Sequence, residues 1–196
     1  MFSSALFRIA VSGFVLTVGA CAAKTQIRVA VCLSYAHDSY LNPDAHMDVE
    51  EATLTASQIF KRAGVTVNWR TPASACLAHQ SRAITITFSA AEPSAEHKEG
   101  LAYALPFEGN HIVVFYSRVK AAVSGDRCPV PKLMGYVLAH EITHLLQKCD
   151  CHSREGVMKG HWSRHDYSQM VYSLLQWAPE DIDLIQTGPW GTRKDK

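Results

Sequence analysis

Short apolar runs and amphipathic stretches alternate along the chain. Residues 27–36, IRVAVCLSYA, are rich in β-branched and apolar side chains and predict a largely buried strand. Residues 47–63 predict a helix that stops at Gly64, and VTVNW, residues 65–69, predicts the next strand. The apolar positions assigned to one face of that helix are Val49, Leu54, Ile59 and Phe60. The order strand, helix, strand predicts a crossover unit whose strands are parallel or nearly adjacent in one sheet.

A second group of strands follows. AITITFS, residues 83–89, alternates apolar and polar side chains as a half-buried strand does. Residues 90–100 are polar and contain proline and glycine, which predicts a surface loop. LAYALPF, residues 101–107, and HIVVFYSRV, residues 111–119, flank a turn-like EGN and predict a hairpin. Pro106 confines the first arm to a sheet edge, because proline cannot donate to a ladder.

The last third of the chain predicts helices. Residues 132–147 form a strongly apolar helix, and residues 163–177 form another, with Ser163 and Asp166 spaced as a capping pair at its start. Pro179 opens a short tail helix. We therefore expect an α+β fold, in which a mixed twisted sheet packs against the 132–147 helix and a helical C-terminal part follows.

Composition restricts the class of protein. The chain has 196 residues, 47% of them hydrophobic and 19% charged, which suits a single domain with one core, assigned to residues 24–196. The formal net charge is +1 and the basic residues are scattered, so we expect no nucleic-acid partner.

The N-terminus predicts export. Arg8 precedes the apolar run IAVSGFVLTVGA, which has the length of a signal peptide and is too short for a permanent membrane span. We assign residues 1–23 to this signal. VGAC resembles a bacterial lipobox, in which cleavage precedes a lipidated Cys21; ordinary cleavage near CAAK remains the alternative. The expected location is periplasmic, cell-envelope or extracellular, with membrane attachment only through Cys21.

Cysteine usage fits an oxidising compartment. Apart from Cys21, the cysteines are Cys32, Cys76, Cys128, Cys149 and Cys151. An odd number means that at least one stays free or pairs outside the chain. The sequence does not assign the pairs.

The candidate chemistry lies in GYVLAHEITHLLQKCDCHSREGVM, residues 135–158. His140 and His144 are four residues apart, so on a helix they differ by roughly 40° and can bind one ion from successive turns. Glu141 lies about 100° round the helix, where its carboxylate can take a proton from a water beside the ion. That division of roles is typical of a hydrolytic zinc helix.

A third ligand is needed, and it must come from a turn. On a continuous helix His152 would lie about 12 Å beyond His144, so the chain must leave the helix and double back. We rank His152 first and Asp150 second as the third ligand. The two nearby cysteines rank last, because thiols in an oxidising compartment tend to form disulfides.

HEITHLLQKCDCHSREGVMKGHW resembles the active-site stretch of metzincin-type zinc metallopeptidases, and more closely that of a group of small exported bacterial metzincin-like proteins. IFKRAGVTVNW and VVFYSRV extend the resemblance over most of the mature chain. The resemblance implies that His140, His144 and His152 bind Zn²⁺, that Glu141 is the general base, and that Met158 is the methionine of the turn beneath the metal.

The chain departs from the metzincin pattern in two ways. Typical metzincins place the third ligand where this chain has Asp150, which keeps that residue as the alternative to His152. Lys148 stands where the related group tends to have glycine, and a left-handed turn there costs roughly 1 to 2 kcal/mol for a residue with a side chain.

These observations predict an exported, monomeric zinc endopeptidase acting on peptides or proteins. The edge strand at residues 100–104 would hold an extended substrate. The hydroxyl of Tyr103, Tyr136 or Tyr167 could reach the oxyanion, and no spacing rule selects one. The alternative function is a zinc-binding, non-hydrolytic interaction protein of the cell envelope.

His161 and His165 repeat the four-residue spacing, but no third ligand lies near them in the sequence. We therefore expect them to lie at the surface or at a helix start rather than to bind a second ion.

Overall fold

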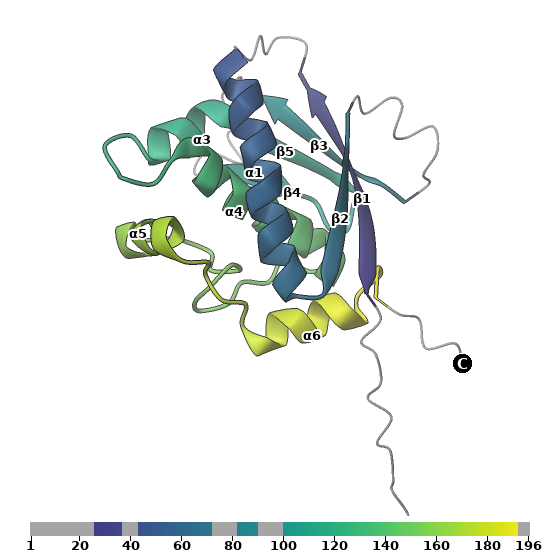
Figure 1. Cartoon of the computed structure of the whole chain (residues 1–196). Coiled ribbons are helices and arrows are strands. Elements are labelled where there is room, and N and C mark those ends of the chain that lie inside the picture. The colour runs from purple at the N-terminus through teal and green to yellow at the C-terminus, as the bar shows by residue number, and fades with distance from the viewer. Residues whose placement is uncertain (1–25, 37–42, 72–81, 90–99, 192–196) are drawn as a thin grey trace, which may run out of the picture.

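The computed structural model describes residues 26–36, 43–71, 82–89 and 100–191, and these form a mixed five-stranded sheet with helices (Figure 1). The strands are β1 (Ile27–Tyr35), β2 (Val65–Arg70), β3 (Ile84–Ser89), β4 (Ala102–Ala104) and β5 (His111–Phe115). Their order across the sheet is β2-β1-β3-β5-β4, and only β4 is antiparallel to its neighbour. The predicted α+β class with a mixed sheet is correct.

The predicted crossover unit is present. Helix α1 (Pro43–Arg62) joins β1 to β2, and these two strands are adjacent and parallel. The helix begins four residues before the predicted start. Its assigned face was partly wrong, since the Leu54 side chain is 64% exposed, whereas Ala52 and Ala56 are fully buried. Five residues separate Leu54 from Val49, which places them about 140° apart on a helix.

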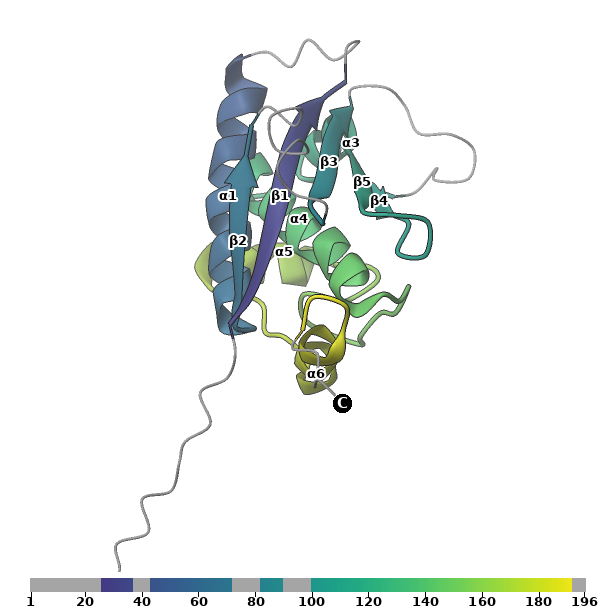
Figure 2. The same cartoon turned by 90° about the vertical axis from the view of Figure 1, so that its right-hand side faces the viewer.

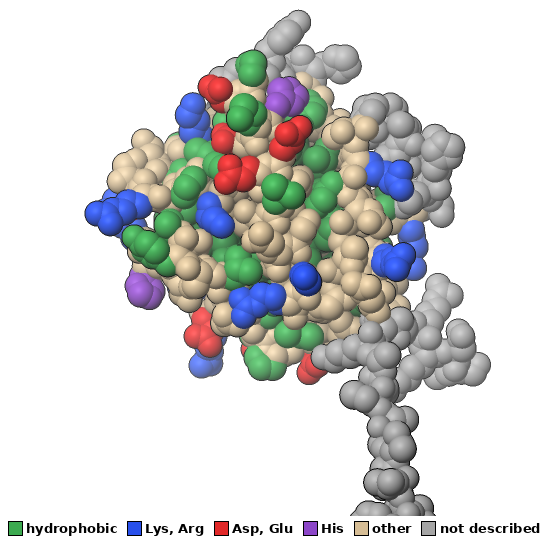
Figure 3. All heavy atoms as spheres, in the orientation of Figure 1, with side chains coloured by type: hydrophobic (Ala, Val, Ile, Leu, Met, Phe, Trp, Pro, Cys, Tyr) green, Lys and Arg blue, Asp and Glu red, His purple; other side chains and the backbone are tan. Residues whose placement is uncertain are grey.

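Figure 3 shows the surface over α1, where hydrophobic and acidic side chains are mixed and basic side chains are scattered. The exposed hydrophobic side chains of this helix are Met47 and Leu54. This face carries no basic stripe, in keeping with the charge pattern of the sequence.

The predicted hairpin exists, but its second arm is shorter than expected. β4 pairs with β5 and lies at the edge of the sheet as predicted, although it ends at Ala104, before Pro106. The chain then turns into α3 (Tyr116–Ala122), although the sequence predicted strand up to residue 119. The Tyr116 hydroxyl donates to the Asp48 carboxylate of α1 at 2.7 Å, and Val119 is fully buried. Tertiary contacts therefore override the strand propensity of this segment.

Helix α4 (Val130–Gln147) lies with α1 on one face of the sheet (Figure 2). Almost all of its side chains are buried, because the sheet, α1 and the C-terminal helices surround it. Gly135 permits the close crossing of the two helices: a Cβ atom at this position would lie 2.5 Å from the Thr55 Cβ and 3.0 Å from the Ala52 carbonyl oxygen.

The C-terminal part contains α5 (Arg164–Tyr172) and α6 (Pro179–Thr187). α6 starts at Pro179 as predicted, and the Ser163–Asp166 capping box opens α5. α5 ends five residues before its predicted end. The apolar residues beyond it, among them Leu175 and Trp177, lie in a non-helical segment and are buried. In this segment the Leu175 amide donates to the Tyr136 hydroxyl at 2.8 Å.

Two predicted segments lie outside the described residues: the signal at residues 1–23, and residues 90–99 of the predicted surface loop. Within the described ranges, no helix is long and apolar enough to cross a membrane.

Candidate metal centre

Two imidazoles project from successive turns of α4 and meet at their Nε2 atoms. The Nε2 atoms of His140 and His144 lie 3.0 Å apart. The Nδ1 atom of His140 lies 3.0 Å from the Val157 carbonyl, and that of His144 lies 3.0 Å from the Cys149 carbonyl. A carbonyl can only accept, so each ring carries its proton on Nδ1 and directs the Nε2 lone pair toward the other ring.

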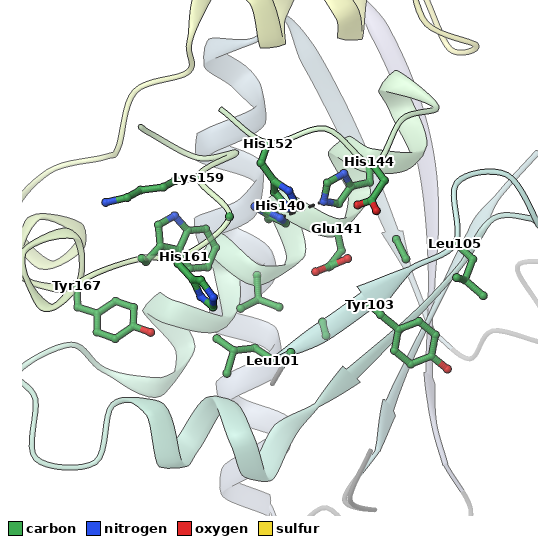
Figure 4. A pocket seen from close by; sticks show the side chains of 17 residues that line it. Leu101, Tyr103, Leu105, His140, Glu141, His144, His152, Lys159, His161 and Tyr167 are labelled. Atoms are coloured by element: carbon green, nitrogen blue, oxygen red, sulfur yellow. Dashed lines mark hydrogen bonds between the residues drawn. The ribbon is translucent and has the colours of Figure 1, made fainter. Parts of the chain in front are cut away.

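The third imidazole arrives through a left-handed turn. Lys148 ends α4 with φ 53° and ψ 47°, and the Cys149 amide donates to the His144 carbonyl at 3.2 Å. The chain then doubles back, as the sequence required, and His152 joins the other two histidines (Figure 4). One ring nitrogen from each of the three lies within 4.8 Å of the others.

Asp150 and the two cysteines behave differently from His152. Asp150 lines the same cavity but is not part of the three-histidine cluster. Cys149 and Cys151 form a disulfide with each other, which excludes them as thiolate ligands. Cys128 is free and buried, as the odd count anticipated.

The segment after His152, residues 157–160, packs against the histidine cluster. Val157 and Met158 are fully buried, and Val157 supplies the carbonyl that orients His140. Gly160 lies against the third imidazole: a Cβ atom there would be 3.3 Å from Cγ of His152. The burial of Met158 fits both a methionine turn and ordinary core packing, so its role beneath a metal stays a prediction.

Glu141 faces the cavity beside the imidazoles (Figure 4). It is 9% exposed. Burial and the nearby Asp150 carboxylate raise the pKa of Glu141 to about 8, and a hydrogen bond from the Ala104 amide of β4 opposes that rise. Burial, with the neighbouring His144, lowers the pKa of His140 to about 3, so this ring is neutral and able to bind a cation.

The cavity has a volume of about 480 Å³ and opens along the sheet edge. Residues 100–105, which include β4, form one wall, and Trp162, His161 and Tyr167 form another. In Figure 4 the Tyr167 hydroxyl points inward, whereas the Tyr103 hydroxyl points away from the imidazoles. Tyr136 is fully buried and is not among the lining residues, so it is a poor oxyanion candidate.

His161 is a cavity residue that sequence reasoning did not select. It is exposed and lines the cavity, and it is not part of the three-histidine cluster. His161 and His165 are both exposed, so the prediction that they lie at the surface is correct. No periodicity or spacing links residue 161 to the cavity, since only the fold of the preceding loop brings it there.

The donor set and its spacing fit a zinc site. Two nitrogens bound tetrahedrally at 2.0 to 2.1 Å from one zinc ion lie about 3.3 Å apart, close to the separation of the His140 and His144 Nε2 atoms. Three imidazole ligands with a remaining open position are typical of catalytic rather than structural zinc. The carbonyls that orient two of the rings complete that pattern.

Two solved structures share the architecture. Archaemetzincin from Methanopyrus kandleri is 15% identical, with a TM-score of 0.54 over 81% of this chain and 94% of the other. A zinc-dependent peptidase from Methanocorpusculum labreanum is 9% identical, with a TM-score of 0.54 over 79% and 99% of the two chains. The chain has a metzincin-like fold.

At these identities the likeness is one of architecture. No protein-family model matches the sequence, and no curated protein matches it. The likeness extends over about four fifths of this chain in both comparisons.

Proposed function

We propose that the chain is a zinc-dependent endopeptidase in which Glu141 is the general base. The observation that carries the proposal is the shared cavity: three converging imidazoles, a buried carboxylate and an open sheet edge line the same space. Two solved structures of like fold are an archaemetzincin and a zinc-dependent peptidase, which supports the same class of reaction.

His140, His144 and His152 would hold the ion. When bound, zinc supplies Lewis acidity that polarises the scissile carbonyl and makes a water more acidic. Glu141 accepts the proton of the attacking water and passes it to the leaving amine. The hydrogen bond from the Ala104 amide fixes the Glu141 carboxylate against β4. The position of the base relative to the strand that would bind the substrate is therefore fixed.

The substrate would lie along β4 as an extended peptide. β4 uses one edge to pair with β5, and residues 100–105 line the cavity. Main-chain hydrogen bonds to this edge give affinity without selecting a side chain. Tyr167, whose hydroxyl points into the cavity, is the candidate donor to the oxyanion.

The test is a peptide-library digest by the purified zinc-loaded chain and by Glu141→Gln. Glutamine keeps the size of the side chain but cannot take the proton, so we expect kcat to fall by roughly 10² to 10⁴-fold. Zinc content, measured by atomic absorption, should stay at one ion per chain. Glu108→Gln, an exposed glutamate of the hairpin turn, is the matched control and should digest normally.

The outcomes separate the candidate functions. Absence of bound zinc in the unchanged chain would overturn the metal site and the enzyme together. Bound zinc with no digestion by either protein would favour the zinc-binding interaction protein. Equal digestion by the unchanged chain and Glu141→Gln would overturn the role of Glu141.

We further propose that the protein is exported and acts as a monomer in the periplasm, envelope or extracellular space. The support is the apolar run after Arg8 and the disulfide between Cys149 and Cys151. Fractionation of cells expressing the full chain tests export, and Cys21→Ser tests lipid attachment. Release of the membrane-bound fraction by Cys21→Ser supports the anchor; an unchanged distribution contradicts it.

A further inference from the structure

His152 is held differently from the other two imidazoles. His140 and His144 each donate from Nδ1 to a main-chain carbonyl. In the part of the chain that the structure describes, no such ring hydrogen bond is found for His152, which is also the exposed member of the cluster. Metal-binding histidines are normally oriented by a partner on the second ring nitrogen. Some other contact must therefore fix the third imidazole.

The next residue in the chain supplies that contact. The Ser153 amide donates to the Met158 carbonyl at 2.8 Å, and the Ser153 hydroxyl donates to Oδ1 of Asp181 at 2.8 Å. Both hydrogen-bond donors of Ser153, the amide and the hydroxyl, are thus engaged immediately after His152. Gly160 lies against the ring, where a Cβ atom would be 3.3 Å from Cγ of His152.

Asp181 lies in the first turn of α6 and is 3% exposed. Its main-chain carbonyl accepts a hydrogen bond from the Gln147 side chain at 3.2 Å. Gln147 is the last residue of α4, so Asp181 contacts both the end of the histidine helix and the loop that returns with His152. One residue of α6 therefore forms hydrogen bonds at both ends of the turn that carries His152, to Gln147 before it and to Ser153 after it.

The chemistry of Asp181 argues against simple core filling. Oδ2 is buried and has no hydrogen-bond partner among the described residues. A buried polar atom without a partner costs about 1 to 3 kcal/mol, and an apolar residue would avoid that cost. A carboxylate is explained at this place by its other oxygen, Oδ1, which accepts the hydrogen bond of the Ser153 hydroxyl. An apolar side chain could not accept that hydrogen bond.

We propose that Asp181 is a positioning residue of the metal centre, which holds His152 in place through the Ser153 hydroxyl. It touches neither substrate nor metal. The proposal rests on the metal site of the proposed function, but it concerns metal affinity and does not depend on peptide hydrolysis.

The test measures zinc affinity of the full chain by competition with a chromophoric chelator. Asp181→Ala and Ser153→Ala should each weaken zinc binding by roughly 10 to 100-fold, the usual effect of removing an outer partner. The double variant should be no weaker than the single variants, because both remove the same hydrogen bond. Asp181→Asn keeps an acceptor oxygen and should stay within about threefold of the unchanged chain.

Asp183→Ala is the matched control, because this aspartate lies on the exposed face of the same helix. The cobalt(II) absorption spectrum gives a second readout: loss of the third imidazole in Asp181→Ala should change its visible bands, while Asp183→Ala should keep them. Should Asp181→Ala fail to fold, the partly exposed Ser153 still allows Ser153→Ala to be measured.

Equal zinc affinity in all variants would overturn the positioning role and leave the proposed function intact. Additive losses in the double variant would show that the two residues act separately, which also overturns it. An unchanged chain that binds no zinc would overturn this inference together with the proposed function.

Discussion

Lys148 shows how a single residue can tolerate an unfavourable backbone. Its φ of 53° lies in the left-handed region that favours glycine. The turn is retained because the Lys148 amide donates to the Leu145 carbonyl at 3.2 Å and the Cys149 amide to the His144 carbonyl at 3.2 Å, which satisfies the end of α4. Lys148 directly precedes the turn that carries His152. The unfavourable backbone conformation of Lys148 therefore allows the chain to double back toward the other two histidines.

Lys148→Gly should therefore stabilise the protein. Removing the side chain relieves the left-handed strain, and we expect the free energy of unfolding in urea to rise by about 0.5 to 1 kcal/mol. Lys61→Gly, at the end of α1 with ordinary helical geometry, is the contrasting control and should lose about 1 kcal/mol. A loss of stability in Lys148→Gly would show that the lysine side chain makes a contact that outweighs the strain.

Asp166 should make the free energy of unfolding depend on pH in the acid range. Burial acts to raise its pKa, but hydrogen bonds from Lys159 and Ser163 outweigh burial and hold the pKa below its usual value. A depressed folded-state pKa stabilises the fold above the unfolded pKa of about 3.9, and that stabilisation is lost as pH falls through the lower folded value.

Asp166→Asn should accordingly lower the free energy of unfolding by about 1 kcal/mol at pH 7, with the difference shrinking below about pH 4. Urea denaturation followed at several pH values measures this. A difference that stayed constant down to pH 2 would contradict the assignment of the effect to the Asp166 charge.

At the scale of elements, α4 decides where the site lies. Its tight crossing with α1 at Gly135 places His140 and His144 opposite the sheet edge. Periodicity located this helix, α1 and the strands, because the 3.6- and 2-residue repeats follow directly from which face is buried. It failed for Leu54, which was assigned to the wrong face, and for α3, where contacts to Asp48 and the core overrode local propensity.

The site was predictable to a similar extent. Helical spacing brings His140, Glu141 and His144 together, and the need for a third ligand required a turn before residue 152. Asp181 and His161 were invisible to this reasoning. Each reaches the centre through the tertiary fold of the C-terminal part, and neither has a fixed sequence spacing from α4.

Gly135→Ala should destabilise the protein, although alanine normally favours a helix. The added Cβ would meet Thr55 at 2.5 Å and the Ala52 carbonyl at 3.0 Å, and backbone cannot move aside cheaply. We expect a loss of about 1 to 3 kcal/mol in urea denaturation, typical of overpacking. A gain of about 1 kcal/mol, as at an exposed helical glycine, would mean that the two helices separate without cost.

The Cys149–Cys151 disulfide lies in the turn between the second and third imidazoles, and the Cys149 carbonyl accepts from the His144 ring. Cys149→Ser with Cys151→Ser should give a folded protein whose zinc affinity is roughly tenfold lower, because the turn gains freedom. Treating the unchanged chain with a phosphine reductant should reproduce the loss, and the double variant should not respond. Equal affinity before and after reduction would contradict a structural role for the bond.

At the scale of the whole molecule, the sheet and α1 form a base on which the C-terminal part assembles the site. α4 packs on α1 and the sheet, while α6 contacts the end of α4 through Asp181 and Gln147. α5 therefore contributes Tyr167 to the cavity, and α6 contacts the end of α4 and Ser153 of the turn that follows it. This arrangement explains why the cavity has walls from segments far apart in the sequence.

Zinc removal should loosen this assembly. We expect the chelator-treated chain to keep its far-ultraviolet circular dichroism, since the buried core does not depend on the ion, but to melt at a lower temperature. Restoring zinc should return the melting temperature. Identical melting with and without zinc would show that the ion does not bind the folded chain preferentially.

The size of that melting shift has a built-in limit. All three imidazoles fall within residues 140–152, so a denatured chain still carries them as near neighbours and competes for the same ion. Zinc that binds the unfolded chain as well as the folded chain stabilises the fold less than zinc that binds the folded chain alone. Saturating zinc should thus raise the melting temperature by less than its affinity for the native form implies.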